Sequence, residues 1–237
     1  MREELTHCPA CLKKDISFYQ SVKDFSTSKE VFDIWSCGHC SHLFTNPRVK
    51  EDLVGPYYDN PDYISHTDDD TSVFAKVYQF LREINLNWKH GHVQKYAEGK
   101  SLLDYGCGTG GFLEFTSTKA YASFGVEKNT HARDQAIRKG LKVVSSWEQL
   151  PQEKFNLISL WHVLEHVSDL DQCIQEIQKR LNTNDILLIA VPNLNAFDAI
   201  YYAEFWAAYD VPRHLWHFSQ RGIKQLIEPC GFELIAQ

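Results

Sequence analysis

The stretch SLLDYGCGTGGF, residues 101–112, decides the fold of this 237-residue chain. It opens with a short apolar run that is typical of a buried strand, and Asp104 lies near the end of that run. Three glycines follow at alternate positions, Gly106, Gly108 and Gly110, before a helical pattern begins. Glycine tolerates positive φ and lets a ligand lie against bare backbone, and the next helix offers unpaired N–H groups. The stretch therefore predicts a ligand-binding corner.

A second polar signal lies one strand later. The next apolar run, YASFGVEKN at residues 121–129, leads into Glu127, about twenty residues beyond the glycines. A carboxylate at the end of that strand can accept hydrogen bonds from both hydroxyls of a ribose. Together, the two signals predict a nucleoside site at the ends of two neighbouring strands.

The rest of this half predicts alternating strands and helices. Apolar positions three and four apart predict a helix over residues 73–97, which Gly91 could divide. We expect strands from residue 101 and at residues 123–127, 141–146, 155–161, 185–191 and 232–236. We expect helices at residues 111–119, 131–140, 168–181 and 219–231. This order implies an α/β fold with a mostly parallel, doubly wound sheet and ligands at the carboxyl ends of its strands.

Four of the seven cysteines form two Cys-x-x-Cys pairs, Cys8 with Cys11 and Cys37 with Cys40. Such pairs in a chain without a secretion signal indicate metal before disulfide, because four thiolates can converge tetrahedrally on zinc. Two redox dithiols, or a ribbon that has lost its metal, stay open as alternatives. Three histidines are near enough to act as substitute ligands: His7, His39 and His42.

Residues 16–37, between the pairs, alternate apolar and polar side chains and predict short strands. We therefore expect a small zinc-ribbon-like β module with structural zinc. It has too few residues to bury a core of its own, so the metal would supply much of its folding free energy.

Residues 47–72 carry prolines, three tyrosines and the acidic run at residues 68–70. They are either an exposed linker, with the acids as a solvated turn or helix cap, or a lid over the cofactor cleft. Tyr57, Tyr58 and Tyr63 favour the lid. The predicted domains are residues 1–46 for the ribbon, 47–72 for the linker or lid, and 73–237 for the α/β domain.

The composition limits the classes of partner and the location that we expect. The net charge is −7, from 24 basic and 31 acidic residues, which argues against nucleic acid as the main partner. No apolar run approaches the length of a membrane span, and the N-terminus lacks the pattern of a signal peptide, so we expect a cytoplasmic protein.

The motif GCGTGG, preceded by Asp104, resembles motif I of the class I S-adenosylmethionine (SAM) methyltransferases rather than a nicotinamide fingerprint. FNLISLWHVLEHVSDL, residues 155–170, looks like the fourth strand of that family and the "LEH" helix after it. The resemblance runs from residue 101 to the C-terminus and implies a Rossmann-like methyltransferase sheet. The "NPR…YY…Y" passage after the cysteines looks like a methyltransferase subfamily with an N-terminal zinc module.

The resemblance also implies a SAM site. The glycines would approach the methionine and ribose parts, Asp104 would hold the turn or reach the ammonium through water, and Glu127 would bind the ribose. Residues 145–147 would cover adenine, although Trp147 could equally be a packed core aromatic. The implied cofactor-binding residues are Asp104, Gly106, Gly108, Gly110, Glu127, Ser146, Trp147 and Trp161.

A methyl transfer from a sulfonium needs alignment of the two partners and one base where the nucleophile carries a proton. The candidates are His162, His166 and His214, each of which could instead be structural. On a helix, His162, Glu165 and His166 would cluster near the cleft mouth, with Trp161 and His162 near the sulfonium.

His214 lies in a loop where the family builds acceptor pockets. The zinc-binding sugar C-methyltransferases share this layout and carry Tyr-x-Glu-His there, whereas this chain reads Val211-Pro212-Arg213-His214. The histidine is kept and the tyrosine and glutamate are not, which puts deoxysugar C-methylation in doubt. Arg213 indicates an anionic acceptor, such as a nucleotide sugar or lipid-linked precursor, or a surface ion pair.

Residues 196–218 are rich in aromatics that either cap the cleft or form an amphipathic helix or dimer contact: Tyr201, Tyr202, Phe205, Trp206, Tyr209 and Trp216. The family sheet normally closes with a seventh strand, but this sequence stops near the sixth, so either it is trimmed or the edge is completed otherwise, and the oligomeric state stays open.

The leading hypothesis is a SAM-dependent methyltransferase of a small-molecule or glycan-precursor acceptor. The alternatives are an RNA-modifying methyltransferase that reads its substrate through the ribbon, and a non-catalytic SAM-fold interaction protein.

Overall fold

The computed structural model describes residues 2–58 and 73–236, with the side chains of residues 73–78 left aside. The chain forms two compact units. The ribbon unit comprises Met1–Ser65, Leu164–Ile174 and Val191–Gln237, and the sheet unit comprises His66–Val163 and Gln175–Ala190. These compact units do not follow the predicted domain boundaries at residues 46 and 72, which stay a prediction. The acidic run and Tyr63 lie outside the described residues.

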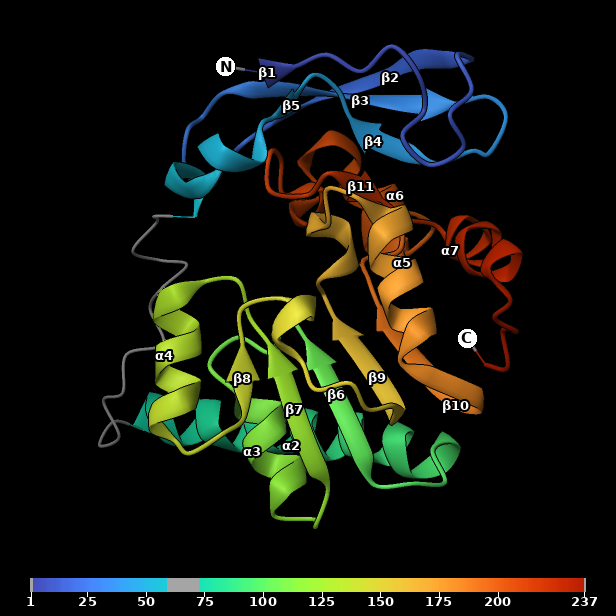
Figure 1. Cartoon of the computed structure of the whole chain (residues 1–237). Helices are drawn as coiled ribbons and strands as arrows, with labels where there is room; N and C mark the ends of the chain where they lie inside the picture. Colours follow the sequence, from blue (N-terminus) through green and yellow to red (C-terminus); the bar gives the residue numbers. More distant parts are fainter. Residues whose placement is uncertain (1, 59–72, 237) are drawn as a thin grey trace. The chain divides into compact units, whose positions relative to one another are not determined.

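The sheet unit is built on five parallel strands in the order β10-β9-β6-β7-β8. Their arrows point the same way in Figure 1. The strands are β6 (Ser101–Tyr105), β7 (Ala122–Val126), β8 (Val143–Val144), β9 (Phe155–Trp161) and β10 (Leu181–Ala190). The predicted parallel sheet is confirmed for its first five strands, and the glycine stretch lies at the carboxyl end of the central strand β6.

Three helices pack along this sheet: α2 (Val73–Tyr96), α3 (Gly111–Ser117) and α4 (Thr130–Arg138). Apolar side chains of α2 and α3, such as Val93 and Leu113, share a core with Leu102 of β6 and Leu157 of β9. The apolar spacing read from the sequence follows the face that this core buries. Gly91 does not interrupt α2.

Three predicted elements differ from the structure. Residues 232–236, with the sequence FELIA, are mostly apolar, but they form no strand. Gly231 before them has φ 83°, and Ile235 is 60% exposed, so the segment has no buried face to hold against a sheet. The predicted third strand, residues 141–146, is only Val143–Val144, and the helix predicted at 168–181 is α5 (Leu170–Lys179).

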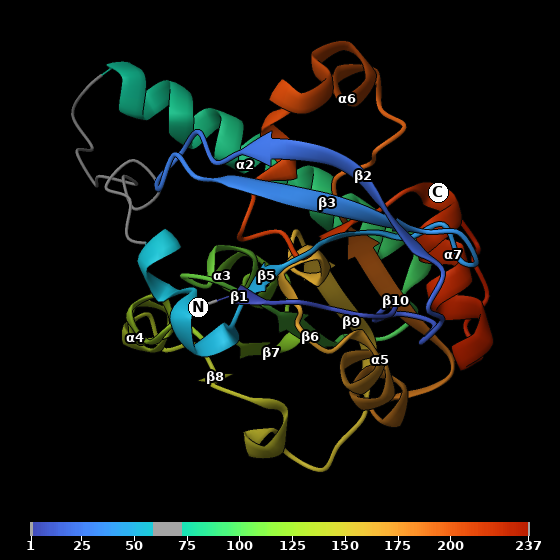
Figure 2. The same cartoon turned by 90° about the horizontal axis from the view of Figure 1, so that it is seen from above.

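The ribbon unit holds a four-stranded antiparallel sheet in the order β11-β4-β3-β2. Its strands are β2 (Ile16–Lys23), β3 (Val31–Cys37), β4 (Leu43–Thr45) and β11 (Trp216–His217), and β1 (Arg2–Glu3) pairs separately with β5 (Arg48–Val49). Figure 2 shows the long β2 and β3 side by side. The outer strand β11 therefore comes from the far end of the chain.

This unit has a core made from both ends of the sequence. Phe32 and Ile34 of β3 belong to the same buried cluster as Trp206, Tyr209 and Val211. The cysteine module was expected to be too small to bury a core, and the C-terminal segment supplies the missing apolar side chains. Its helices are α6 (Phe197–Tyr202) and α7 (Gln220–Ile227), with short 3-10 turns at Glu51–Leu53, Gly55–Tyr57, Leu164–His166, Ala203–Phe205, Ala207–Tyr209 and Glu228–Cys230.

Candidate functional site

The three loop glycines have positive φ angles of 74° at Gly106, 57° at Gly108 and 79° at Gly110. A Cβ at Gly106 would lie 2.4 Å from a methyl of Val163, and one at Gly110 would lie 2.3 Å from a methyl of Leu141. Both glycines are therefore required by close packing as well as by conformation. A Cβ at Gly108 would meet no atom within 4 Å. Gly108 thus presents bare backbone to open space.

Glu127 lies beside this loop. One of its carboxylate oxygens accepts a hydrogen bond from the Gly108 N–H at 2.8 Å, and the other accepts one from the Asn129 N–H at 2.8 Å. The register of β6 and β7 pairs Tyr105 with Val126, so both strands end at the same level. The carboxylate is therefore held against the open backbone of Gly108.

Asp104 lies beneath the loop and is only 3% exposed. Ser159 of β9 donates a hydrogen bond from its hydroxyl to Asp104 at 2.7 Å. Burial raises the pKa of the Asp104 carboxyl to about 7, although the Ser159 bond and the charge of Lys89 oppose the shift, and the charge of Glu127 adds to it. This carboxyl therefore changes its charge near neutral pH.

Lys89 is a candidate site residue that sequence reasoning missed. Its ammonium lies 4.7 Å from the ring centre of Trp161 and 5.9 Å from that of Phe112. Burial lowers the pKa of Lys89, and the charge of Asp104 offsets only part of this shift. The periodicity of α2 indicated only a packed helix, so no sequence signal separated this lysine from the others.

Trp161, predicted near the sulfonium, stands at the end of β9. Within the described part of the chain, its indole N–H is buried without a hydrogen-bond partner. Its ring packs edge-on against Phe112 at 5.7 Å and near Trp88 at 6.2 Å. The indole therefore offers a donor at the same edge of the sheet as Asp104.

Trp147, proposed as a cover for adenine, is a packed core residue. Its ring stacks on Tyr105 with centroids 4.4 Å apart and planes within 12°. The Arg180 guanidinium lies 5.3 Å from the ring centre and donates to the Trp147 carbonyl at 2.8 Å. The structure thus favours the structural alternative for Trp147. Ser146, half-buried, precedes the 3-10 turn Trp147–Gln149, and Ser145 donates to Gln149.

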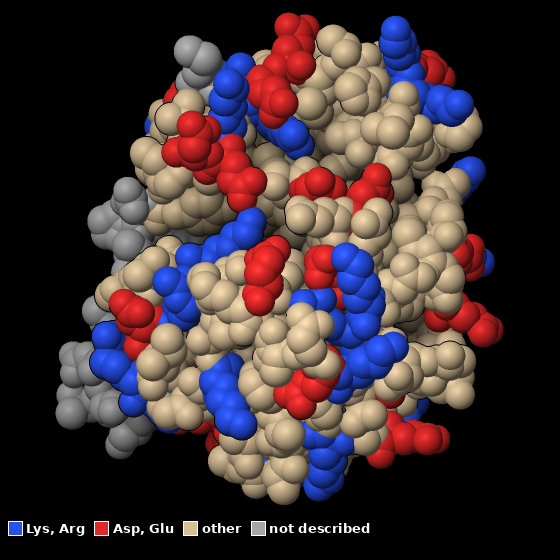
Figure 3. Space-filling model, in the orientation of Figure 1, with Lys and Arg blue, Asp and Glu red and all other residues tan. Residues whose placement is uncertain are grey.

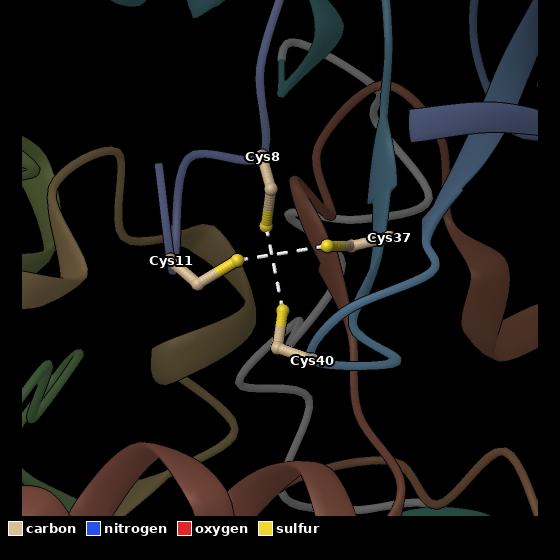
Figure 4. Close-up of side chains that lie close together, drawn as sticks. All are labelled: Cys8, Cys11, Cys37 and Cys40. Atoms are coloured by element: carbon tan, nitrogen blue, oxygen red, sulfur yellow. Dashed lines mark hydrogen bonds between the residues drawn. The ribbon is translucent and has the colours of Figure 1, made fainter. Parts of the chain in front are cut away.

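The four cysteines converge in the ribbon unit, as Figure 4 shows. Their sulfurs all lie within 4.8 Å of one another, with 3.5 Å between Cys8 and Cys40 and 3.6 Å between Cys11 and Cys37. A zinc ion with Zn–S bonds of about 2.3 Å makes tetrahedral edges of about 3.8 Å. The observed spacing fits this geometry.

Two matching turns place these thiols. The carbonyl of Cys8 accepts from the Leu12 N–H at 2.9 Å, and the carbonyl of Cys37 accepts from the Ser41 N–H at 2.9 Å. Leu12 and Ser41 both have positive φ, 61° and 58°. A ring nitrogen of His42 lies 3.3 Å from the Cys40 sulfur, next to the cluster rather than in it. The exposed His7 and His39 are not part of it either.

The three histidines do not share one helix. His162 has φ 57° and leaves β9 exposed, and only Leu164–His166 form a 3-10 turn, so the expected cluster on one helical face is wrong. His162 belongs to the sheet unit, whereas His166 and His214 belong to the ribbon unit with ring centres 4.6 Å apart. Burial and the charge of His166 lower the pKa of His214 to about 4.

Arg213 is not available to an anionic acceptor. It is 1% exposed, and its guanidinium forms ion pairs with Asp210 and Asp24 and donates to the Tyr57 carbonyl. The two carboxylates compensate the charge of this buried guanidinium, so it does not pair with an acceptor. The pair is therefore a buried structural one rather than the predicted surface one.

The aromatic stretch divides into two sets. Trp206, Tyr209 and Trp216 are buried in the ribbon unit and do not form an aromatic cap, because their rings pack in its core. Four other aromatics are exposed on α6 and the turn after it: Phe197, Tyr201, Tyr202 and Phe205. In α6 only Ala199 is buried, so the amphipathic helix and the dimer contact both stay predictions.

Residues 78–237 match the family described as "Methyltransferase domain". The chain belongs to this methyltransferase family. Over 101 residues it is 36% identical to the ubiquinone biosynthesis O-methyltransferase of Pelagibacter ubique, which covers 39% of this chain and 42% of that protein. The chain thus spans less than half the length of that relative.

Two solved structures share the fold of this methyltransferase. The plantazolicin methyltransferase BpumL in complex with SAH has a TM-score of 0.54 at 15% identity and covers 74% of this chain and 72% of its own. A possible histamine N-methyltransferase from Thermotoga maritima has a TM-score of 0.52 at 19% identity and covers 67% and 76%. At these identities the likeness shows the fold of a SAM-dependent methyltransferase.

One face of the methyltransferase is drawn in Figure 3 and carries mixed charge. On the face drawn in Figure 3, lysines and arginines are interspersed with acids rather than gathered into one basic surface. Among the described residues, no helix has the length and apolarity needed to span a bilayer.

Proposed function

We propose that this methyltransferase binds SAM at the corner between β6 and β7 and transfers its methyl group to a small-molecule acceptor. The observation that carries the proposal is the open backbone at Gly108 with the Glu127 carboxylate held against it. Each carboxylate oxygen has a second lone pair, so Glu127 can bind both ribose hydroxyls while it keeps its two backbone bonds. The room at Gly108 is what a nucleoside lying on the loop needs.

The bound cofactor would supply an activated methyl group, and the residues of the chain position it. Asp104 of β6 and Trp161 of β9 lie near the carboxyl ends of adjacent strands, and the Lys89 ammonium of α2 lies over the Trp161 ring and interacts with the charge of Asp104. We propose that Asp104 contacts the ammonium of SAM through a bridging water. A nearby positive charge stabilises the ionised form of a buried carboxyl.

The charge of Asp104 makes SAM affinity depend on pH. A bound cation stabilises the ionised carboxyl and lowers its pKa, so binding releases a proton wherever the free protein is still protonated. With a free-protein pKa of about 7, affinity should rise as pH rises and level off above that value. We expect about a tenfold gain between about pH 6 and about pH 8. Calorimetry should find this gain in the wild type and not in Asp104→Asn; equal slopes in both would remove Asp104 from the site.

Among the histidines, His162 is the one we propose as the base. It is exposed and belongs to the same compact unit as Gly108 and Glu127, at the exit of β9. A histidine suits proton removal near neutral pH. A His162→Gln variant that kept the full transfer rate would exclude this role.

The acceptor is proposed as a small hydroxyl compound or a glycan precursor. The O-methyltransferase relative supports a hydroxyl acceptor, and the resemblance to the zinc-binding sugar methyltransferases supports a nucleotide-sugar or lipid-linked one. The net charge of −7 disfavours RNA, and so does the mixed charge on the face drawn in Figure 3. Incubation with SAM and panels of phenols, nucleotide sugars and RNA, read by product mass, tests these classes, with Glu127→Ala as the blank. Methylated RNA alone would overturn the proposal.

We also propose that Cys8, Cys11, Cys37 and Cys40 hold a structural zinc ion. The four sulfurs would close its coordination sphere, which leaves no position for a substrate. The ion would tie the turn at Cys8 to the turn at Cys37 and so fix the start of β2 and the end of β3.

A further inference from the structure

Three side chains that can ligate a metal gather in the ribbon unit outside the cysteine cluster. Glu165 and His166 lie in the turn Leu164–His166, and His214 lies just before β11. Each offers one ligand atom, and these atoms all lie within 4.8 Å of one another. All three residues belong to the same compact unit, so their spacing is fixed by its packing.

Hydrogen bonds hold the turn Leu164–His166 and the segment around His214 together. The Leu215 N–H donates to the Glu165 carbonyl at 2.8 Å, and the Trp216 indole donates to the Val167 carbonyl at 2.7 Å. These bonds tie the turn to the residues around His214. The rings of His166 and His214 meet edge to face at 77°.

The hydrogen bonds orient both imidazoles. The Nδ1 of His214 lies 2.8 Å from the Ala208 carbonyl, and the Nδ1 of His166 lies 3.0 Å from the Arg213 carbonyl. A carbonyl only accepts, so each Nδ1 carries the proton and each Nε2 keeps a lone pair. Histidine ligands of metals typically show this arrangement, with the second nitrogen bound to a carbonyl. The Tyr58 hydroxyl, 3.1 Å from Nδ1 of His166, lies on the same side of that ring.

Two of the three side chains are buried, and His166 is half-buried. Glu165 is 0% exposed and His214 is 8% exposed. Asp210 has an oxygen 3.8 Å from Nε2 of His214, but Arg213 binds both of its oxygens.

We propose that Glu165, His166 and His214 form a second metal site, which binds one divalent first-row transition-metal ion through a carboxylate oxygen and two imidazole nitrogens. Imidazole donors suit Zn²⁺, Co²⁺ and Fe²⁺, whereas Mg²⁺ and Ca²⁺ prefer oxygen ligands. His166 also lines a cavity of about 720 Å³ within the ribbon unit, from which water or a ligand oxygen could complete the coordination. The proposal goes beyond the proposed function and does not depend on SAM.

The test uses the full chain with zinc in its cysteine cluster and no SAM. Co²⁺ is titrated in, and cobalt X-ray absorption reports its ligands. We expect one Co²⁺ per chain with a nitrogen and oxygen shell and no sulfur shell, and excess Mg²⁺ should not displace it. A sulfur shell, displacement by Mg²⁺, or no saturable binding would overturn the proposal.

Substitutions of the proposed ligands test which side chains bind the metal ion. His214→Gln and Glu165→Gln should each weaken Co²⁺ binding at least about tenfold, whereas His131→Gln, an exposed histidine of α4, should bind as the wild type. Binding that is unchanged in a folded His214→Gln protein would contradict the proposal. If a variant does not fold, the ligand shell of the wild type still decides it.

Discussion

Replacing Glu127 with alanine is expected to weaken SAM binding about a hundredfold, or about 3 kcal/mol. The change removes an ionised acceptor that can bind two ribose hydroxyls, and hydrogen bonds to a charged group contribute about 1.5–3 kcal/mol each. It also removes the bonds to the N–H groups of Gly108 and Asn129, so part of the loss comes from a looser loop. Calorimetry with SAM measures the effect directly.

Two further variants separate these contributions. Glu127→Gln keeps an acceptor oxygen but not the charge, so its affinity should fall between those of the alanine variant and the wild type. Glu148→Ala removes an exposed acid of the same unit and should bind SAM normally. An affinity of Glu127→Ala within about twofold of the wild type would show that the ribose lies elsewhere.

Replacing Cys37 with serine is expected to abolish zinc binding and to lower the free energy of unfolding of the ribbon unit by about 5 kcal/mol. Three remaining thiols hold zinc poorly, and the two turns at Cys8 and Cys37 lose their common tie. The shared core with Trp206 and Val211 stays, so partial structure should survive. Elemental analysis and thermal unfolding with and without a chelator measure both effects.

Cys230→Ser is the matched control for this variant. Cys230 is half-buried and does not belong to the cysteine cluster, so its replacement should leave the zinc content unchanged. A wild-type protein that contains no zinc and melts at the same temperature with and without chelator would contradict the structural role of the cluster.

The central half of the fold could be predicted because its signals are local. The strand, glycine turn and helix around Gly108 depend on residues within a few positions of one another, and each of the five apolar runs became a strand of the parallel sheet. The Cys-x-x-Cys spacing likewise fixes its own turns. These features need no knowledge of distant partners.

What could not be predicted depends on contacts far apart in sequence. Arg213 looked like a surface cation, but Asp24, 189 positions earlier, pairs with it in the interior. The same long-range packing buries Trp206 against β3 and makes the C-terminal segment part of the ribbon unit. Residues 232–236 show the converse, because a short apolar run forms a strand only where a neighbouring strand pairs with it.

The most direct test of the account is a calorimetric titration of the wild-type protein with SAM and with its demethylated product. We expect saturable binding with one site per chain, competition of the two compounds for that site, and an affinity about a hundredfold lower in Glu127→Ala. No binding of either compound to the folded, zinc-loaded protein would contradict the assignment of the corner at Gly108 as a cofactor site.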